Sequence, residues 1–410
     1  MTSRTRPPSI ERSPSLMTRL AGIGAAVLAF ASAIEPNLVL RYGPVVAIVT
    51  LILSNPRRLR LGWTEVLLGL FVVWIGYSQL WSVAPERYLV NALTLVSSAL
   101  SFVAVRAAID RGVNLFVVFV AYVSGNFVAL AMTSWQLVAN GEAQLDGDRV
   151  TQAGVLNVNH VAYGLVASIA LVVLLWRSSV MQQPIVRVLT ITLLVFLVAG
   201  VLATGTRSAL LAILCLAAWL VIRWLGGSLR ALTVVVVAWS VFVSAGWLDR
   251  VLELVDFGER GRGGLSGRLD IWPVARQLWD QDWLLGSGLG AVRSATPDQL
   301  ASHNTILETG STLGLVGLVV FFAFLVLSQR DRLGELPDST RDLRLGVVIA
   351  TLTPIVLSGI WEYDASGWMA LALLGQPFIE RSTQRAVATD DRGALLTAGG
   401  PPALVGIAAR

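Results

Sequence analysis

Long apolar runs recur along most of this sequence, and they constrain its fold more than any other feature. A helix that crosses a bilayer needs about 20 mostly apolar residues, and we count about twelve runs of this kind. They lie at 18–34, 38–54, 63–82, 88–109, 113–136, 156–176, 186–204, 207–225, 230–248, 304–328, 344–361 and 366–380. The pattern predicts an all-α fold, a polytopic membrane helix bundle of about twelve transmembrane helices, with the lipid bilayer as its surroundings.

Composition agrees with a membrane protein and excludes other classes. Hydrophobic residues make up 55% of the chain and charged residues 14%, which is too little charge for a soluble domain of this length. The chain has no lysine, so all 31 basic residues are arginine. These arginines are scattered over short loops instead of forming a patch, so we predict no nucleic-acid partner. The single cysteine, Cys215, cannot form a disulfide within the chain.

The distribution of arginine predicts the orientation. Alternate loops are rich in arginine, and the loops between them are poor in it. The rich segments are 4–19, 57–60, 106–111, 177–187, 223–230, 330–344 and 381–410, whereas the short poor loops hold Arg41, Arg87, Arg149 and Arg207. Because arginine-rich short loops stay in the cytoplasm, both termini are predicted to be cytoplasmic. The expected location is the cell inner (cytoplasmic) membrane, as a multi-pass protein.

Three parts of the chain differ in composition. Residues 1–16 are rich in Arg, Pro and Ser and predict a disordered cytoplasmic tail, and residues 381–410 predict a second cytoplasmic tail. The membrane domain is predicted over 17–380, and its first apolar run is interpreted as a membrane helix instead of a removed signal peptide. A large outer loop is expected at 249–303. Within it, the helical spacing of apolar residues over 269–283 predicts an amphipathic helix on the membrane surface.

The stretch SHNTILETG places one of the two histidines of the chain at the outer start of an apolar run. The imidazole of His303 can accept a proton at physiological pH, as a general base must. The alternative is a hydrogen-bonded histidine at the helix end. Asn304 is predicted to be the N-cap of the helix 304–328. Glu308, about one turn further, is expected to orient the base or to accept from a sugar hydroxyl.

Two arginines are candidates for binding an anion. Arg207, in ATGTRSALL, begins an apolar run at the outer face, where it either snorkels to the surface or grips phosphate oxygens in bidentate fashion. Arg268, in SGRLDIW, opens the predicted loop helix and either binds an anion, pairs with Asp270 or is solvated. The remaining polar cluster, Asn157, Asn159 and His160, falls in one turn at the start of a span. It predicts a polar cavity or hydrogen bonds between helices.

Other motifs are rejected as sites. The sequences DGD at 146–148 and DQD at 280–282 lack the surrounding strand–helix pattern of nucleotide-sugar enzymes, and GSGLG at 286–290 lacks the spacing of a dinucleotide fingerprint. We therefore expect no metal site and no cofactor. Gly310, Gly314 and Gly317 predict close packing between helices.

Taken in order, these pieces resemble the O-antigen ligase and O-antigen polymerase superfamily of bacterial membrane glycosyltransferases. The resemblance is concentrated in residues 154–320. It rests on the Asn-rich start of a span, on TGTRSA, on the large outer loop with GRLDIW and LLGSGLG, and on SHNTILETGSTLGLVGL. One departure is Ser208, where members of the family often have glycine. The resemblance implies a type C glycosyltransferase-like fold of about a dozen helices.

The resemblance also implies a function. Members of this family take a glycan from undecaprenyl diphosphate and transfer it to an acceptor hydroxyl on the outer face of the membrane, without metal or nucleotide. Ligases transfer it to a lipid core, and polymerases transfer it to another lipid-linked repeat unit. By motif, Arg207 and Arg268 are implied to bind the diphosphate and His303 to be the catalytic base. Asn159, His160, Asn304 and Glu308 are possible acceptor-binding or orienting residues. The implied partners are an undecaprenyl-diphosphate-linked oligosaccharide and a glycan or lipid acceptor.

Two other functions stay open at this point. One is a transporter or flippase of the same superfamily, moving bicarbonate or a lipid-linked glycan, with polar residues inside the spans lining the path. The other is a scaffold for envelope assembly, in which the polar residues only cap helices. A transport site belongs near the membrane midplane, whereas His303, Arg207 and Arg268 are predicted at the outer face.

Overall fold

The computed structural model describes ten stretches of the chain. They are residues 15–54, 62–136, 143–146, 149–153, 156–176, 183–224, 268–296, 301–333, 338–358 and 364–376. The predicted span 230–248 and nearly all of the two predicted tails lie outside the described residues.

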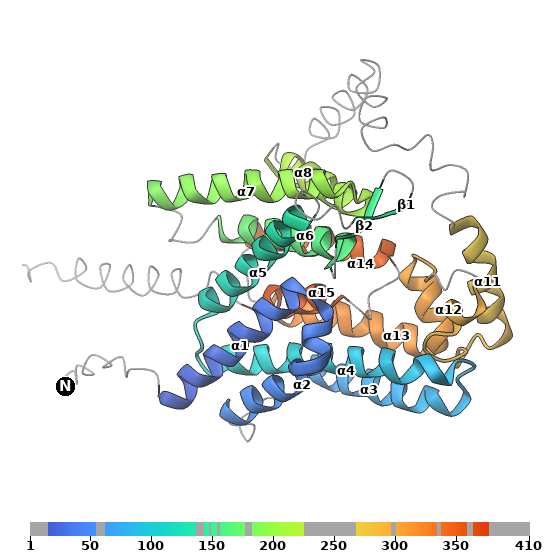
Figure 1. The fold of residues 1–410 in the computed structure, drawn as a ribbon. Helices are drawn as coiled ribbons and strands as arrows, with labels where there is room; N and C mark the ends of the chain where they lie inside the picture. Colours follow the sequence, from blue (N-terminus) through green and yellow to red (C-terminus); the bar gives the residue numbers. More distant parts are fainter. Residues whose placement is uncertain are drawn as a thin grey trace, which may run out of the picture.

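Eleven of the predicted spans coincide with helices of the structure (Figure 1). The helices that match spans are α1 (Leu16–Ile34), α2 (Pro36–Leu53), α3 (Trp63–Ser78), α4 (Pro85–Asp110), α5 (Leu115–Trp135), α6 (Val158–Leu175), α7 (Pro184–Thr204), α8 (Arg207–Trp224), α13 (Thr305–Leu333), α14 (Asp338–Ser358) and α15 (Ala365–Leu374). A short 3-10 helix, η2 (Gln79–Trp81), continues α3.

The described stretches account for only part of the predicted spans by helix length and composition. Within the described stretches, 7 helices are long and apolar enough to cross a membrane, and α2, α14 and α15 contribute shorter apolar segments. The expected polytopic, helical membrane protein is therefore confirmed in outline. The count of about twelve spans is not.

Two helices that are neighbours in sequence, α6 and α7, differ in their place in the bundle: α6 is central and α7 is peripheral. Helix α6 packs against α5, α7, α8, α14 and α15, and 89% of its apolar window is buried. In α7 the corresponding share is 22%. The exposed face of α7 carries Ile185, Val195 and Phe196, as expected where a helix faces lipid.

A small antiparallel sheet precedes α6, and the sequence analysis did not predict it. Its strands are β1 (Ala143–Asp146), β2 (Arg149–Ala153) and β3 (Leu156–Asn157), in the order β1-β2-β3. Asp146 pairs with Arg149 across the first turn, so the first Asp of the DGD motif belongs to a hairpin. The hairpin leads directly into Asn157, which begins the polar cluster at the start of α6.

Two arginines assigned to inner loops bind the carboxyl ends of helices. Arg111, after α4, donates to the Ser54 carbonyl at the end of α2, and Arg344 of α14 donates to the Leu374 and Gln376 carbonyls at the end of α15. A cation is favoured at a helix carboxyl end because the carbonyl groups there are unpaired. The structure therefore brings together helix ends that the arginine pattern assigned to one side of the membrane.

Candidate functional site

The chain just before α13 forms a tightly bonded loop around His303. Among the described residues other than glycine, His303 alone has a positive φ, of 52°. The backbone of the preceding residue, Ser302, is held on both sides. Its N–H donates to Glu308 Oε2 at 2.8 Å, and its carbonyl accepts from Trp272 Nε1 at 2.8 Å. A left-handed conformation costs a non-glycine residue about 1–3 kcal/mol and persists only where its surroundings enforce it.

Asn304 is the N-cap of α13, as the sequence predicts. Its Oδ1 accepts from the backbone N–H of Ile306 at 3.0 Å and of Leu307 at 3.3 Å. The Ser302 hydroxyl donates to the Asn304 carbonyl at 2.9 Å. The cap fixes where α13 starts. It therefore also fixes the position of the half-buried His303, which directly precedes the cap.

Glu308 is fully enclosed one turn into α13. Its side chain is buried, with the carboxylate bonded to Ser302 and in electrostatic interaction with Arg293 of α12 (Ala291–Ala295). The carboxylate therefore braces the loop that carries His303. We call Trp272, Ser302, His303, Asn304 and Glu308 the α13 group.

A break in α13 holds the loop between α11 and α12 against this group. Gly314 is non-helical, with φ 68° and ψ −173°. The loop after α11 (Arg268–Gln281) bonds to the freed backbone, with the N–H of Leu315 donating to the Trp283 carbonyl at 2.9 Å and that of Ser287 to the Ser311 carbonyl at 2.8 Å. A Cβ on Gly314 would lie 2.1 Å from the Leu284 carbonyl oxygen. Gly314 therefore permits a helix break, which corrects the prediction that it serves helix packing.

Helix α11 confirms the predicted loop helix, and its apolar face packs against protein. Ile271 and Ala275 are buried with Val292 of α12, and Leu278 and Leu307 pack around them. Figure 1 shows α11 and α12 beside the start of α13. The amphipathic pattern is therefore satisfied by α12 and α13. Arg268 begins α11, but its side chain lies outside the described part of the structure.

The predicted arginine segment at α8 meets the predicted polar turn of α6. The Thr206 hydroxyl donates to Asn159 Oδ1 at 3.2 Å, and the Ser208 hydroxyl donates to the Tyr163 hydroxyl at 3.3 Å. Arg207 lies between these two contacts as the half-buried first residue of α8. Gly205 turns the chain there with φ 61°, a conformation that glycine adopts easily.

Asn157 caps α6 in the same way that Asn304 caps α13. Its Oδ1 accepts from the N–H of Asn159 at 2.9 Å and of His160 at 3.4 Å. We call Asn157, Asn159, Thr206 and Arg207 the α6–α8 group. The N-termini of two helices meet in this group, and helix N-termini favour anions.

His160 points to the other side of α6 and meets a residue that the sequence analysis missed. Its Nδ1 lies 3.3 Å from Oδ1 of Asp364, and both side chains are buried. Asp364 is the N-cap of α15 and accepts from the Gly367 N–H at 3.0 Å. The polar interruption WEYDASG between the last two predicted spans was its only signal in the sequence.

The rejected metal motif DQD has structural partners. Asp280 pairs with Arg276 at 3.0 Å on the exposed surface of α11, and Asp282 accepts from the Leu285 N–H at 3.2 Å. Over the stretches that the structure describes, no three His, Cys, Asp or Glu side chains gather as a metal site would require. Arg276 is thus accounted for as a surface ion-pair partner.

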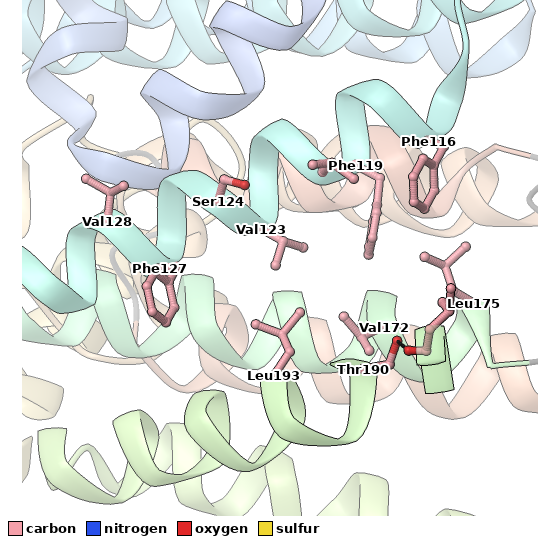
Figure 2. Close-up of a pocket in the computed structure, with 12 residues that line it drawn as sticks. Phe116, Phe119, Val123, Ser124, Phe127, Val128, Val172, Leu175, Thr190 and Leu193 are labelled. Carbon is pink, nitrogen blue, oxygen red and sulfur yellow. Dashed lines mark hydrogen bonds between the residues drawn. The ribbon is translucent and has the colours of Figure 1, made fainter. Parts of the chain in front are cut away.

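A cavity of about 420 Å³ lies between α5, α6 and α7 (Figure 2). Phe116, Phe119 and Phe127 of α5 face Val172 of α6 and Leu193 of α7 across it. The lining is almost entirely apolar. The pocket lies near the end of α6 and the beginning of α7, whereas the α6–α8 group lies at the opposite ends of the same two helices.

The predicted residues therefore gather in two described groups. Asn159 is joined to the segment that carries Arg207, and His303 is joined to Asn304 and Glu308. Figure 1 shows α6 and α8 apart from α11 and α12, which lie beside α13. The first group offers cationic and helix-terminal anion binding, and the second offers a braced imidazole. Trp272, which belongs to the second group, and Arg293, which interacts with Glu308, were not predicted.

Comparison with known families supports the resemblance seen in the sequence. Residues 192–322 match the family described as O-antigen ligase. The search of curated proteins gives no match. The match supports the O-antigen ligase/polymerase superfamily, a glycosyltransferase-like class of membrane proteins, and O-antigen ligase/polymerase-type activity in general.

Proposed function

We propose that this chain, which carries an O-antigen ligase domain at residues 192–322, transfers a glycan from undecaprenyl diphosphate to an acceptor hydroxyl. The transfer takes place at the outer face of the cytoplasmic membrane, during polymerisation or ligation of a surface polysaccharide. The observation that carries the proposal is that the matched segment contains Arg207, Arg268 and His303 together. It runs from within α7, through α8 and the large loop, into α13.

His303 acts as the general base. Its imidazole removes the proton from the acceptor hydroxyl as the oxygen attacks the anomeric carbon of the donor glycan, a contribution of about 10²–10⁴-fold to the rate. The enforced left-handed backbone supports this role, because strain of this kind is kept where the direction of a side chain matters. Glu308 and Trp272 hold the Ser302 backbone on either side and so fix that direction.

Arg207 and Arg268 bind the diphosphate. As the bond from the anomeric carbon to the phosphate oxygen breaks, that oxygen keeps the electron pair, and the two guanidinium groups stabilise its charge. Attack from the face opposite the leaving diphosphate inverts the anomeric centre. Positive charge from arginine and from the start of α8 makes this a metal-independent reaction.

The apolar pocket beside α6 and α7 supports a substrate with a long hydrocarbon chain. Both helices extend from the pocket to the α6–α8 group, so a lipid that has its diphosphate at Arg207 has its tail along the same helix pair. Over the 13 residues from Asn159 to Val172, α6 rises about 20 Å. The bilayer and this apolar pocket together position the donor.

The test is a transfer assay with purified protein in liposomes. Undecaprenyl-diphosphate-linked repeat units are supplied alone or with a lipid-core acceptor, in the presence and absence of EDTA, and the products are separated on a gel. A ladder identifies a polymerase, and a single shifted acceptor identifies a ligase. No product with either acceptor refutes the proposal and favours a transporter or flippase. Loss of product only with EDTA refutes metal independence.

A further inference from the structure

The first turn of α6 is tied on two opposite sides. On one side, Asn159 accepts from the Thr206 hydroxyl at 3.2 Å, one residue before Arg207. On the other side, His160 meets Asp364 at 3.3 Å. Since Asn159 and His160 are consecutive, any rotation of this turn moves both contacts together. The position of Asp364 is therefore linked mechanically to the position of Arg207.

Asp364 is itself held in place by α15. Its Oδ1 accepts from the Gly367 N–H at 3.0 Å, so the same oxygen caps α15 and faces the His160 imidazole. Next to it, the Tyr122 hydroxyl of α5 bonds to the Ser366 hydroxyl at 2.7 Å. The start of α15 is thereby fixed to α5 on one side and to α6 on the other.

The contact between α6 and these helices leaves no room for adjustment. A Cβ on Gly164, one turn after His160, would lie 1.9 Å from Asn126 Oδ1 and 2.9 Å from Ser366 Oγ. Protein interiors transmit displacement because they are close-packed. A shift at Asp364 is thus passed to the first turn of α6 instead of being absorbed.

The pair leaves a buried polar atom unsatisfied. Within the described part of the structure, Asp364 Oδ2 is buried without a hydrogen-bond partner, whereas the His160 ring also faces the Ser32 backbone. Buried polar atoms are normally satisfied, and apolar residues of similar volume often stabilise a core at least as well as a buried ion pair. The placement of this pair beside the Asn159–Thr206 contact points to a task beyond stability.

We propose that Asp364 is a positioning residue for the donor: through His160 it fixes the first turn of α6, so that Asn159 holds the Thr206–Arg207 segment where the diphosphate binds. This inference rests on the proposed function. It assigns Asp364 a selective effect on donor binding.

The test separates the contact with His160 from the helix cap. Asp364→Asn keeps a good N-cap residue but removes the carboxylate from the imidazole, whereas Asp364→Ala removes both. In the liposome assay, Asp364→Asn is expected to raise the KM for the lipid-linked diphosphate donor about tenfold and to leave the KM for the acceptor unchanged. Combined with His160→Ala, it is expected to add nothing to the effect of either single change.

The matched control is Tyr122→Phe, which removes the bond to Ser366 at the start of the same helix. Because Asp364 keeps its cap of α15 and its contact with His160, Tyr122→Phe is expected to lower thermal stability and to change the donor KM less than Asp364→Asn does. Equal changes in the donor KM for Tyr122→Phe and Asp364→Asn, or additive effects of His160→Ala and Asp364→Asn, would overturn the proposal. So would an unchanged donor KM in Asp364→Asn.

A second measurement needs no substrate. Ser208→Cys, made in a Cys215→Ser background, places a single thiol in the first turn of α8 and leaves the Asn159–Thr206 contact intact. Asp364→Asn is expected to raise its rate of labelling by a thiol reagent more than Tyr122→Phe does. Unchanged labelling in Asp364→Asn overturns the positioning role. If the unaltered protein transfers no glycan, the proposed function fails, whereas the labelling still decides whether Asp364 positions α8.

Discussion

The α13 group and the α6–α8 group both stand at helix N-termini capped by asparagine, yet they hold their functional residue in different ways. His303 precedes its helix, on a left-handed backbone that is braced by side chains from α11 and α13. Arg207 is the first residue of its helix, between two side-chain contacts to α6. The first arrangement fixes a backbone, and the second fixes a helix end.

The difference fits the two tasks proposed for these residues. A general base must lie within hydrogen-bond reach of one proton, so its direction has to be set closely. A guanidinium that binds a diphosphate has several hydrogen-bond donors and a charge that acts over distance. It is therefore enough to fix the position of the helix that carries it, and the direction of the side chain does not have to be set as closely. Changes in the α13 group should therefore affect turnover, and changes in the α6–α8 group should affect donor affinity.

The largest effect is expected from His303→Ala. Removal of the base should lower kcat about 10²–10⁴-fold, while the donor KM and the stability of the protein stay close to those of the unaltered chain. Initial rates in the liposome assay measure kcat and the donor KM, and thermal unfolding in detergent measures the stability. Full turnover in the variant would show that His303 is only a residue at a helix end.

The next effect is expected from Glu308→Ala. This change leaves the buried Ser302 N–H without its acceptor, which costs about 1–3 kcal/mol and frees the His303 backbone. Both kcat and the free energy of unfolding should fall. Glu308→Gln keeps an acceptor oxygen and is the matched control, expected to recover most of the loss. Equal kcat losses in the two variants would instead assign the carboxylate charge, and not the bond to Ser302, to the reaction.

A smaller and different effect is expected from Arg207→Lys. The charge is kept but the planar, bidentate guanidinium is lost, so the donor KM should rise by about tenfold, with a smaller change in kcat. Titration of the donor at saturating acceptor measures it. An unaltered donor KM would indicate an arginine that only reaches the membrane surface.

The smallest effect is expected from removing the two caps. Asn304→Ala and Asn157→Ala each remove a side-chain acceptor for two backbone N–H groups, and each should cost about 1 kcal/mol of stability. Asn304→Ala should lower kcat, whereas Asn157→Ala should raise the donor KM. The reverse assignment, obtained from the same kinetic assay, would contradict the division of tasks between the groups.

Much of the fold could be predicted because the bilayer imposes a length on each helix. Apolar runs matched eleven helices of the structure, and Asn304 was recognised as a cap because its residue type and its place before an apolar run define one. Helix α11 was found from its spacing of apolar residues. The helices that α11 packs against could not be predicted, because the same amphipathic face fits a membrane surface or another helix equally well.

Other features depended on contacts between distant segments. Apolarity alone cannot distinguish α6 from α7, although one is the centre of the bundle and the other its edge. Asp364 lay in a short polar interruption that carried no pattern until α15 placed it against His160. The sequence predicts helix packing at Gly314 and not a helix break, because the loop that bonds to the broken helix comes from another segment of the chain.

The sequence by itself determined that this chain is a helical membrane protein with an O-antigen ligase-like segment and a set of candidate residues at helix starts. Local physics is enough for that, because apolar length, arginine placement and cap residues act within a few turns of chain. Only the tertiary structure decided that Asn159 meets Thr206, that His160 meets Asp364, and that the His303 backbone is left-handed. Each of these depends on which helix ends lie side by side, and that is set by packing over the whole bundle.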